Sequence, residues 1–535
     1  MLKYIFLFKA IYLYDKIYII NIIKVINLKK LFSLIYILIL CYVLTGCSSA
    51  GGISTFTVGV EKVGTNFDPQ IATDNSDLLV LTNVYDGLFE KQDGQIVKNT
   101  AESCDISADG KTYTITIKQG NLYHYKGDKE RRDAFEGVEV KAKDYVFAIQ
   151  RILDPKTHSP YTESFSNVES IVATGDYSLV IKLKKPDFNF TEKLASTAAY
   201  PCNREFFATC TGAYGLSVDN ILSNGPFKLN YLDSENGNAT IVSTRREDGD
   251  KLSRIRLIEV ESDNFPAAYQ NDEISGFFAY SADNNRYENT AVMEYESANI
   301  SLVFNLSKPV LANDNIRKAL AWYAWGFENS GANKNAVTVH TSIFPGTVTL
   351  AGRYMTDLYT PVQPAYMAAQ PEEMMNSGLA QMGKTRMDPC TVLMPSDSIY
   401  TLIYENINQL WQKNLGQFFT IEYLPVSQIK QRIAKGEFDM AFLPVSPDND
   451  TPYGILDMFT AFDSDVSALV NSAKGQTNQT NALADITAAA EIVNEKAMIV
   501  PMGSEKTVFY YRNYFHNIYI DPFTSIINLK YTTVK

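Results

Sequence analysis

Histidine is scarce in this chain: only His124, His158, His340 and His516 occur among 535 residues. No two of them lie within reach of each other along one helix or strand, so a histidine-built metal site or catalytic triad would need long-range convergence. The patterns His-Glu-x-x-His and Gly-x-Ser-x-Gly are absent as well. No spacing of carboxylates singles out an acid–base pair. We therefore predict no enzymatic activity, no metal and no cofactor.

Positive charge is also in deficit, because 48 lysines and arginines stand against 60 aspartates and glutamates, a net charge of −12. Phosphate binding requires a surplus of cations, so nucleic acid is not an expected partner. The composition is otherwise that of a globular protein, with 46% hydrophobic and 20% charged residues. At this length a single hydrophobic core is excluded, and two to four domains are expected.

Cysteine is too sparse for a disulfide framework. The six positions are Cys41, Cys47, Cys104, Cys202, Cys210 and Cys390. Cys202 and Cys210 are close enough in the sequence to form a disulfide, but two free buried thiols are an equally good interpretation.

The first 46 residues have the order of a signal peptide. Lys29-Lys30 precede an apolar run over residues 31–43, which is too short for a comfortable membrane span, and Leu44-Thr-Gly-Cys47 follows. This box resembles a bacterial lipobox, in which the peptidase cleaves before the cysteine and the thiol carries diacylglycerol. We predict a lipid anchor at Cys47; the alternative is a membrane-anchoring helix with an incidental cysteine.

Residues 1–27 do not fit that leader, because they are rich in Ile, Tyr and Lys, as translated AT-rich DNA would be. We interpret them as an upstream extension, with translation starting at Leu28 from a TTG codon. Residues 47–55 are predicted to comprise the lipidated cysteine and a short tether, because small polar residues follow Cys47.

Hydrophobic periodicity predicts most of the regular structure. Period-two alternation predicts strands over residues 111–118 and 177–183, and apolar stripes predict helices over 141–153 and 314–323. In the later half, strands over 390–394, 418–424 and 438–443 alternate with helices over 398–415 and 427–434. This alternation predicts a parallel sheet, whose carboxyl edge is where ligands bind. The loop 444–452 is therefore a candidate ligand contact.

Two short motifs resemble known binding sites, but their sequence context argues against a nucleotide site and a calcium site. Gly378-Leu-Ala-Gln-Met-Gly-Lys-Thr385 matches the Walker A expression, but a helical sequence precedes it and Pro389 forbids the long helix that phosphate binding needs. The alternative is a helix end with a glycine turn. Asp448-Asn-Asp450 begins like a calcium loop, but Tyr453 replaces the required glycine and no acidic residue closes the loop.

A series of segments, in order, resembles the oligopeptide/dipeptide/nickel-binding family of solute-binding proteins of ABC importers (extracellular solute-binding protein family 5). The matching segments are Asn83-Val-Tyr-Asp-Gly-Leu-Phe-Glu90, Ser107-Ala-Asp-Gly-Lys-Thr-Tyr113, Ala148-Ile-Gln-Arg-Ile-Leu-Asp-Pro155, Asn224-Gly-Pro-Phe-Lys-Leu229, Ile316-Arg-Lys-Ala-Leu320 and Gly436-Glu-Phe-Asp439. Two places depart from the family: after Leu320, Trp322-Tyr-Ala-Trp325-Gly326 appears where the family usually continues into an "ala-ile-asp-arg" helix end, and Val445 replaces a common tryptophan.

The resemblance implies an α/β, two-lobed periplasmic-binding-protein-like fold of type II, in the large cluster with an extra inserted domain. It implies mixed sheets with helices on both faces and a hinge between the lobes. The expected boundaries are lobe 1 over 56–303, including an insert over roughly 91–220, lobe 2 over 304–506, and a return to lobe 1 over 507–535.

The resemblance also implies the ligand contacts. Asp448 falls where a family carboxylate meets the ligand α-amino group; the alternative is an aspartate that caps a turn. The remaining expected ligand-binding residues are Val445, Ser446 and Pro447 from one lobe and Thr73, Asp74, Asn75 and Tyr85 from the other. Tyr85 is equally consistent with core packing.

The expected function is that of an extracytoplasmic, membrane-anchored monomer that captures peptides and delivers them to the permease subunits of an ABC importer. Three alternatives stay open at this point. The ligand could be another solute, such as a nickel chelate or a sugar; the protein could sense peptides without transport; or it could be a secreted hydrolase.

Overall fold

The computed structural model describes residues 54–535 except 93, 245–250, 281–286, 326–336, 339, 397, 399 and 448. The predicted signal peptide, the predicted lipidation site Cys47 and the candidate ligand residue Asp448 therefore lie outside the described residues. The chain divides into two compact units, Met1–Thr55 and Phe56–Lys535, and almost all of the described residues belong to the second.

An 11-stranded mixed sheet runs through the fold. Its strands run in the order β17 (Thr420–Leu424), β16 (Thr391–Pro395), β18 (Met440–Val445), β12 (Thr290–Phe304), β19 (Ile499–Arg512), β11 (Gly276–Tyr280), β1 (Thr55–Val60), β10 (Arg254–Glu259), β9 (Asn238–Ser243) and β8 (Phe227–Asp233), with β13 (Val337–Thr338) paired to β19. The pairs β16–β17, β16–β18 and β1–β11 are parallel, whereas β12–β19 is antiparallel.

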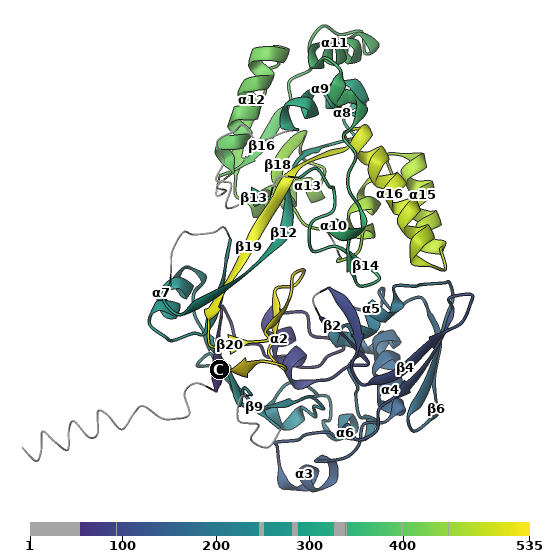
Figure 1. Cartoon of the computed structure of the whole chain (residues 1–535), viewed down its shortest axis with the longest axis vertical. Coiled ribbons are helices and arrows are strands. Elements are labelled where there is room, and N and C mark those ends of the chain that lie inside the picture. Colours follow the sequence, from purple (N-terminus) through teal and green to yellow (C-terminus); the bar gives the residue numbers. More distant parts are fainter. Residues whose placement is uncertain are drawn as a thin grey trace, which may run out of the picture. The chain divides into compact units, whose positions relative to one another are not determined.

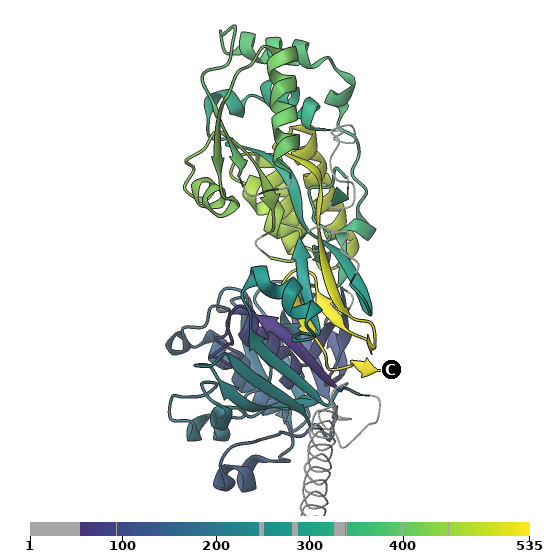
Figure 2. The same cartoon turned by 90° about the vertical axis from the view of Figure 1, so that its left-hand side faces the viewer.

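Two long strands connect the two lobes. β12 and β19 lie side by side and run from the body that carries β8–β10 to the body that carries β16–β18 (Figures 1 and 2). Their register shifts between Glu296 and Ala298 and between Ile300 and Ser301. Bulges of this kind bend and twist a strand pair, which suits the passage from one lobe to the other.

The first lobe has its own cores. One core packs around α2 (Asn75–Val84) and contains the fully buried Phe56 and Leu81. A second core lies under a four-stranded antiparallel sheet, β4 (Ala101–Ile106), β5 (Thr112–Ile117), β7 (Ser178–Leu183) and β6 (Val168–Gly175), together with α4 (Ala142–Leu153). A third cluster joins α7 (Phe265–Gln270) to β11.

Helix α4 shows why this segment could be predicted as a helix from the sequence. Its apolar stripe is buried, including Tyr145 and Ile149, and the Asp144 carboxylate accepts a hydrogen bond from the Lys141 amide at 2.9 Å. The helix ends at Leu153, because the residue before Pro155 is driven to an extended conformation. The predicted helix over 141–153 and the predicted strands over 111–118 and 177–183 are confirmed.

The second lobe is built on the parallel strands β16, β17 and β18. Helix α12 (Thr401–Leu415) buries Trp411, whose ring stacks on Phe442 and whose indole N–H donates to the Leu320 carbonyl at 2.9 Å. Gly416, at φ 62°, ends this helix in the left-handed conformation that glycine tolerates. The predicted strand–helix alternation and parallel pairing are confirmed.

Further helices cover this lobe: α9 (Asp314–Ala324), α11 (Pro371–Gln381), α13 (Val426–Ala434), α15 (Ser464–Gly475) and α16 (Gln479–Glu495). Short helices are α3 (Lys129–Phe135), α5 (Phe190–Ala195), α6 (Arg204–Thr209), α8 (Pro309–Ala312), α10 (Met355–Leu358) and α14 (Tyr453–Leu456). Four two-stranded antiparallel sheets complete the described strands: β2 (Phe89–Gln92) with β3 (Gln95–Lys98), β14 (Thr349–Leu350) with β15 (Arg353–Tyr354), β20 (Phe515–His516) with β23 (Thr533–Val534), and β21 (Tyr519–Asp521) with β22 (Ile526–Asn528).

Two open questions from the sequence are resolved by the structure. Cys202 and Cys210 are free, buried thiols. The Walker A match lies on the end of α11, where Gly378 is inside the helix and Gly383, at φ 68°, forms the turn that follows it. No phosphate loop is formed there.

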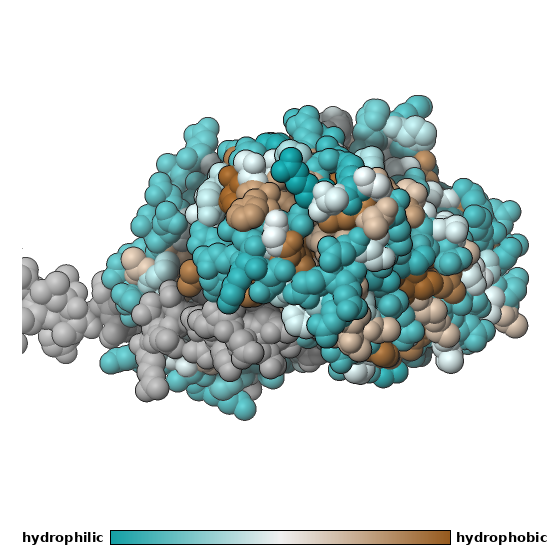
Figure 3. Space-filling view, turned by 90° about the horizontal axis from the view of Figure 1, so that it is seen from above, coloured by the Kyte–Doolittle hydropathy of each residue, from teal (hydrophilic) through white to brown (hydrophobic). Residues whose placement is uncertain are grey.

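On the face that Figure 3 shows, hydrophilic residues predominate and hydrophobic ones occur in small groups. Across the part of the chain that the structure describes, no helix is both long and apolar enough to cross a membrane.

Candidate functional site

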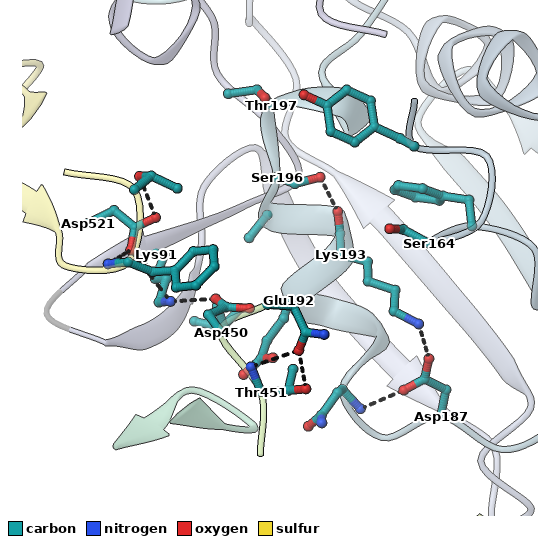
Figure 4. Close-up of a pocket in the computed structure, with 18 of the residues that line it drawn as sticks. Lys91, Ser164, Asp187, Glu192, Lys193, Ser196, Thr197, Asp450, Thr451 and Asp521 are labelled. Carbon is teal, nitrogen blue, oxygen red and sulfur yellow. Dashed lines mark hydrogen bonds and ion pairs between the residues drawn. The ribbon is translucent and has the colours of Figure 1, made fainter. Parts of the chain in front are cut away.

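A cavity of about 980 Å³ lies between the two lobes. The first lobe contributes β2, α5 and the β21–β22 hairpin to its wall, and the second lobe contributes the loop that follows β18 (Figure 4). Both polar and aromatic side chains line it, among them Lys91, Glu192, Tyr200, Asp450 and Asp521. A cavity of this size with a few convergent polar groups is the usual form of a small-ligand site.

The loop after β18 is where the parallel-sheet rule directs attention. Its residues Asn449, Asp450 and Thr451 line the cavity. β18 lies beside the parallel strand β16, and the loop begins at its carboxyl end. The sheet topology therefore presents this loop to the space between the lobes.

Lys91 is the central cation of the site. Its ammonium nitrogen lies 2.7 Å from Asp450 Oδ2 of the second lobe and 3.7 Å from Asp521 Oδ1 of the first. Burial opposes the charged form, but Asp521 and Asp450 outweigh it, so the pKa of Lys91 is raised above its ordinary value. The lysine stays charged and joins the lobes by an ion pair.

Glu192 of α5 is the least satisfied carboxyl group in the wall. Its Oε1 accepts hydrogen bonds from the Gly352 amide at 2.7 Å and from the Thr349 hydroxyl at 3.4 Å. Its Oε2 is buried and has no hydrogen-bond partner among the described residues. Burial, followed by repulsion from Asp450, raises the pKa of Glu192 to about 7.

The cavity therefore combines one lysine with three carboxylates, Glu192, Asp450 and Asp521, on one side (Figure 4). On the other side Lys193 pairs with Asp187 at 2.7 Å. Charges of both signs facing a roomy, partly aromatic cavity suit a ligand that itself carries both an ammonium and a carboxylate group.

Of the ligand-binding residues predicted individually from the sequence, those that the structure describes do not line this cavity. Thr73, Asp74 and Asn75 are exposed at the start of α2, and that helix reaches the cavity through Leu78 and Thr82 instead.

Val445 and Pro447 are buried, and Ser446 is exposed, at the end of β18. Tyr85 is fully buried, with its hydroxyl 3.3 Å from that of Tyr214 and its ring stacked on Tyr200. Their roles in ligand binding stay predictions.

The sequence did not reveal Lys91, Glu192 and Asp521 as candidates. They lie on a four-residue strand, a six-residue helix and a three-residue strand, and none belongs to a chemical motif. Only the position of Asp450, in the loop 444–452, carried a signal.

Two lobes on a shared mixed sheet, with a charged cavity between them, define an α/β solute-binding protein of the two-lobed type. The family model described as "Bacterial extracellular solute-binding proteins, family 5 Middle" matches residues 95–465. The chain belongs to this family, which confirms the resemblance seen in the sequence.

Curated relatives extend over most of the chain. A dipeptide-binding protein of Lactococcus lactis subsp. cremoris is 23% identical over 443 residues, which cover 74% of this chain and 76% of that protein. The dipeptide-binding protein DppE of Bacillus subtilis is 22% identical over 485 residues, covering 83% of this chain and 85% of the relative.

Among solved structures, Listeria monocytogenes OppA bound to peptide has the same fold. It aligns with a TM-score of 0.61 at 22% identity, covering 90% of this chain and 99% of that one.

Proposed function

We propose that this protein is a lipid-anchored receptor outside the cytoplasm that captures oligopeptides between its lobes and delivers them to an ABC-type importer. The observation that carries the proposal is the interlobe cavity of about 980 Å³, with carboxylates contributed by both lobes. Membership of a solute-binding family and the peptide-binding relatives support it.

The chemistry of a peptide fits such a wall. A peptide offers an ammonium group, a carboxylate and a repeating backbone of donors and acceptors, which a cleft can bind as it would an added strand. In this proposal Asp448 receives the ligand α-amino group. Backbone groups of Val445, Ser446 and Pro447 pair with the peptide from the second lobe. Thr73, Asp74 and Asn75 do so from the first lobe, and Tyr85 supports them.

The anchoring and the domain limits belong to the same proposal. Cleavage before Cys47 and lipidation of its thiol would hold a monomer at the outer face of the membrane, close to its permease. Lobe 1 then spans 56–303 with an insert over roughly 91–220, lobe 2 spans 304–506, and residues 507–535 return to lobe 1. The separate core under the four-stranded sheet supports the insert.

Replacing Asp448 with alanine is expected to weaken peptide binding at least tenfold, because removing one partner of a desolvated charge pair costs about 2–5 kcal/mol. Isothermal titration calorimetry with a pool of unblocked tetrapeptides measures the loss. Asp388→Ala is the control, since Asp388 is exposed and forms a surface ion pair with Lys384.

The same titration with N-acetylated tetrapeptides tests the assigned partner group. If Asp448 binds the α-amino group, acetylation weakens binding to the wild type and has little further effect on Asp448→Ala. Unchanged affinity in the variant would refute this role of Asp448, and no binding of either pool to the wild type would refute peptide capture.

A further inference from the structure

Besides the connecting strands β12 and β19 and the ion pair between Lys91 and Asp450, the two lobes also touch at the β14–β15 hairpin. The β14–β15 hairpin belongs to the second lobe, where Val348 and Leu350 are fully buried in its core. The Gln479 side chain donates to the Leu350 carbonyl at 2.9 Å, and the Thr349 amide donates to the Asp450 carbonyl at 2.7 Å. The hairpin is thus firmly seated on its own lobe.

The tip of this hairpin is bound by side chains of the other lobe. Ala351 and Gly352 form a two-residue turn with φ values of 51° and 75°, the form in which both central residues have positive φ. Asn189 Oδ1 accepts a hydrogen bond from the Ala351 amide at 3.0 Å, and Glu192 Oε1 accepts one from the Gly352 amide at 2.7 Å. Both donors of the turn are therefore held by the first lobe.

The turn of the β14–β15 hairpin also packs closely against the β2–β3 hairpin of the first lobe. A Cβ atom on Gly352 would lie 2.8 Å from the backbone nitrogen of Ile96, so the turn approaches β3 as closely as only glycine allows. Facing it, a Cβ atom on Gly94 would collide with the ring of Tyr354. Phe188 of the first lobe packs against the core of the second lobe in the same region.

We propose that the β14–β15 hairpin, bound at its turn by Asn189 and Glu192, is an interlobe clasp, in which groups of this chain alone hold the two lobes together beside the cavity. Because all of its contacts lie within the chain, the clasp goes beyond the proposed function and stands or falls independently of it. Because Asn189, Glu192 and Asp450 also line the cavity, opening of the lobes and access to the site share these contacts.

Glu192 makes the clasp sensitive to pH. The groups that face it are Asp450 and Lys91, with the Thr349 hydroxyl and the Gly352 amide, and Asp521 stands behind Lys91. Its pKa is raised from an ordinary 4.5 to about 7 in the clasped state, where burial disfavours the ionised form. Ionisation therefore favours release, and the clasp weakens as pH rises from about 4.5 to about 7 and changes little above.

Hydrogen–deuterium exchange of the full, ligand-free chain tests the clasp at the amides of residues 351 and 352. Gly352→Ala should speed their exchange at least tenfold. Gly383→Ala is the matched control, because Gly383 also has a positive φ of 68° but has open space around its Cβ position. It should leave exchange at 351 and 352 within twofold of the wild type. Equal exchange in wild type and Gly352→Ala would overturn the proposal.

A second pair of variants keeps the test decisive if Gly352→Ala fails to fold. After correction for intrinsic rates, wild-type protection at residues 351 and 352 should fall between pH 5 and pH 8. Glu192→Gln retains an acceptor without the charge, and its protection should stay constant over that range. Glu163→Gln, an exposed glutamate on the same cavity, should follow the wild type. A pH-independent wild type, or an unaltered decline in Glu192→Gln, would contradict the role given to Glu192.

Discussion

Replacing Lys530 with methionine is expected to lower the free energy of unfolding by about 3–5 kcal/mol, the usual cost of removing one partner of a buried charge pair. Lys530 is almost completely buried. Its ammonium nitrogen lies 2.8 Å from Glu90 Oε1 and 3.0 Å from Asp86 Oδ1, and it also donates to the Tyr85 carbonyl at 3.1 Å. Methionine would fill the space but leave both carboxylates without their cation.

The shifted pKa of Glu90 also shows that this carboxylate depends on Lys530. Burial acts to raise the pKa of Glu90, but the nearby Lys530 overcomes it, so the pKa ends below its ordinary value. The pair therefore stabilises the fold above the ordinary pKa of the glutamate, and this contribution is lost as the pH falls through the lowered one. The cluster ties the C-terminal segment to β2 and to the end of α2.

Urea denaturation followed by far-UV circular dichroism measures the loss. Lys435→Met, at an exposed position, should change stability by less than about 0.5 kcal/mol. Because Lys530 and Glu90 act as a pair, Lys530→Met combined with Glu90→Gln should cost less than the sum of the single variants. Additive losses would show that the two groups are not coupled.

Replacing Arg151 with leucine is expected to lower the free energy of unfolding by about 3–5 kcal/mol as well, because it leaves the buried Asp68 carboxylate without its cation. The guanidinium binds Asp68 through two hydrogen bonds, Nη2 to Oδ2 at 2.5 Å and Nη1 to Oδ1 at 3.0 Å. It also donates to Gln70 and lies over the ring of Phe207 at 4.3 Å. Both charged side chains are less than a tenth exposed.

Arg151→Lys should recover only part of the loss, because an ammonium group cannot reproduce the two parallel hydrogen bonds of a guanidinium. Arg204→Leu is a matched control: Arg204 also lies over a phenylalanine, at 4.4 Å from the Phe147 ring, but is exposed. Thermal unfolding by calorimetry should rank the wild type and Arg204→Leu together, then Arg151→Lys, then Arg151→Leu. Equal stability of Arg151→Lys and the wild type would mean that charge alone is needed.

The regular elements could be predicted because local rules agree in them. In α4 and α12 an apolar stripe, a stop signal and the tertiary burial all point to the same helix, and Gly416 ends α12 as the sequence indicates. The order β16, α12, β17, α13, β18 likewise predicted parallel pairing and the position of the loop beside the cavity.

The charges of the site could not be predicted in that way. Lys91, Glu192, Asp450 and Asp521 come from four distant segments, and only the tertiary fold brings them together. The β14–β15 hairpin carries two residues per strand, too few for periodicity to reveal. Its importance comes from the hydrogen bonds that Asn189 and Glu192 of the first lobe accept from its turn.

Mass spectrometry of the small molecules released from the protein, purified without added ligand, tests peptide capture most directly. We expect intact peptides with free termini, bound at up to one per chain and released on denaturation. A bound metal chelate, a sugar, or peptides found only as cleavage products would contradict peptide capture.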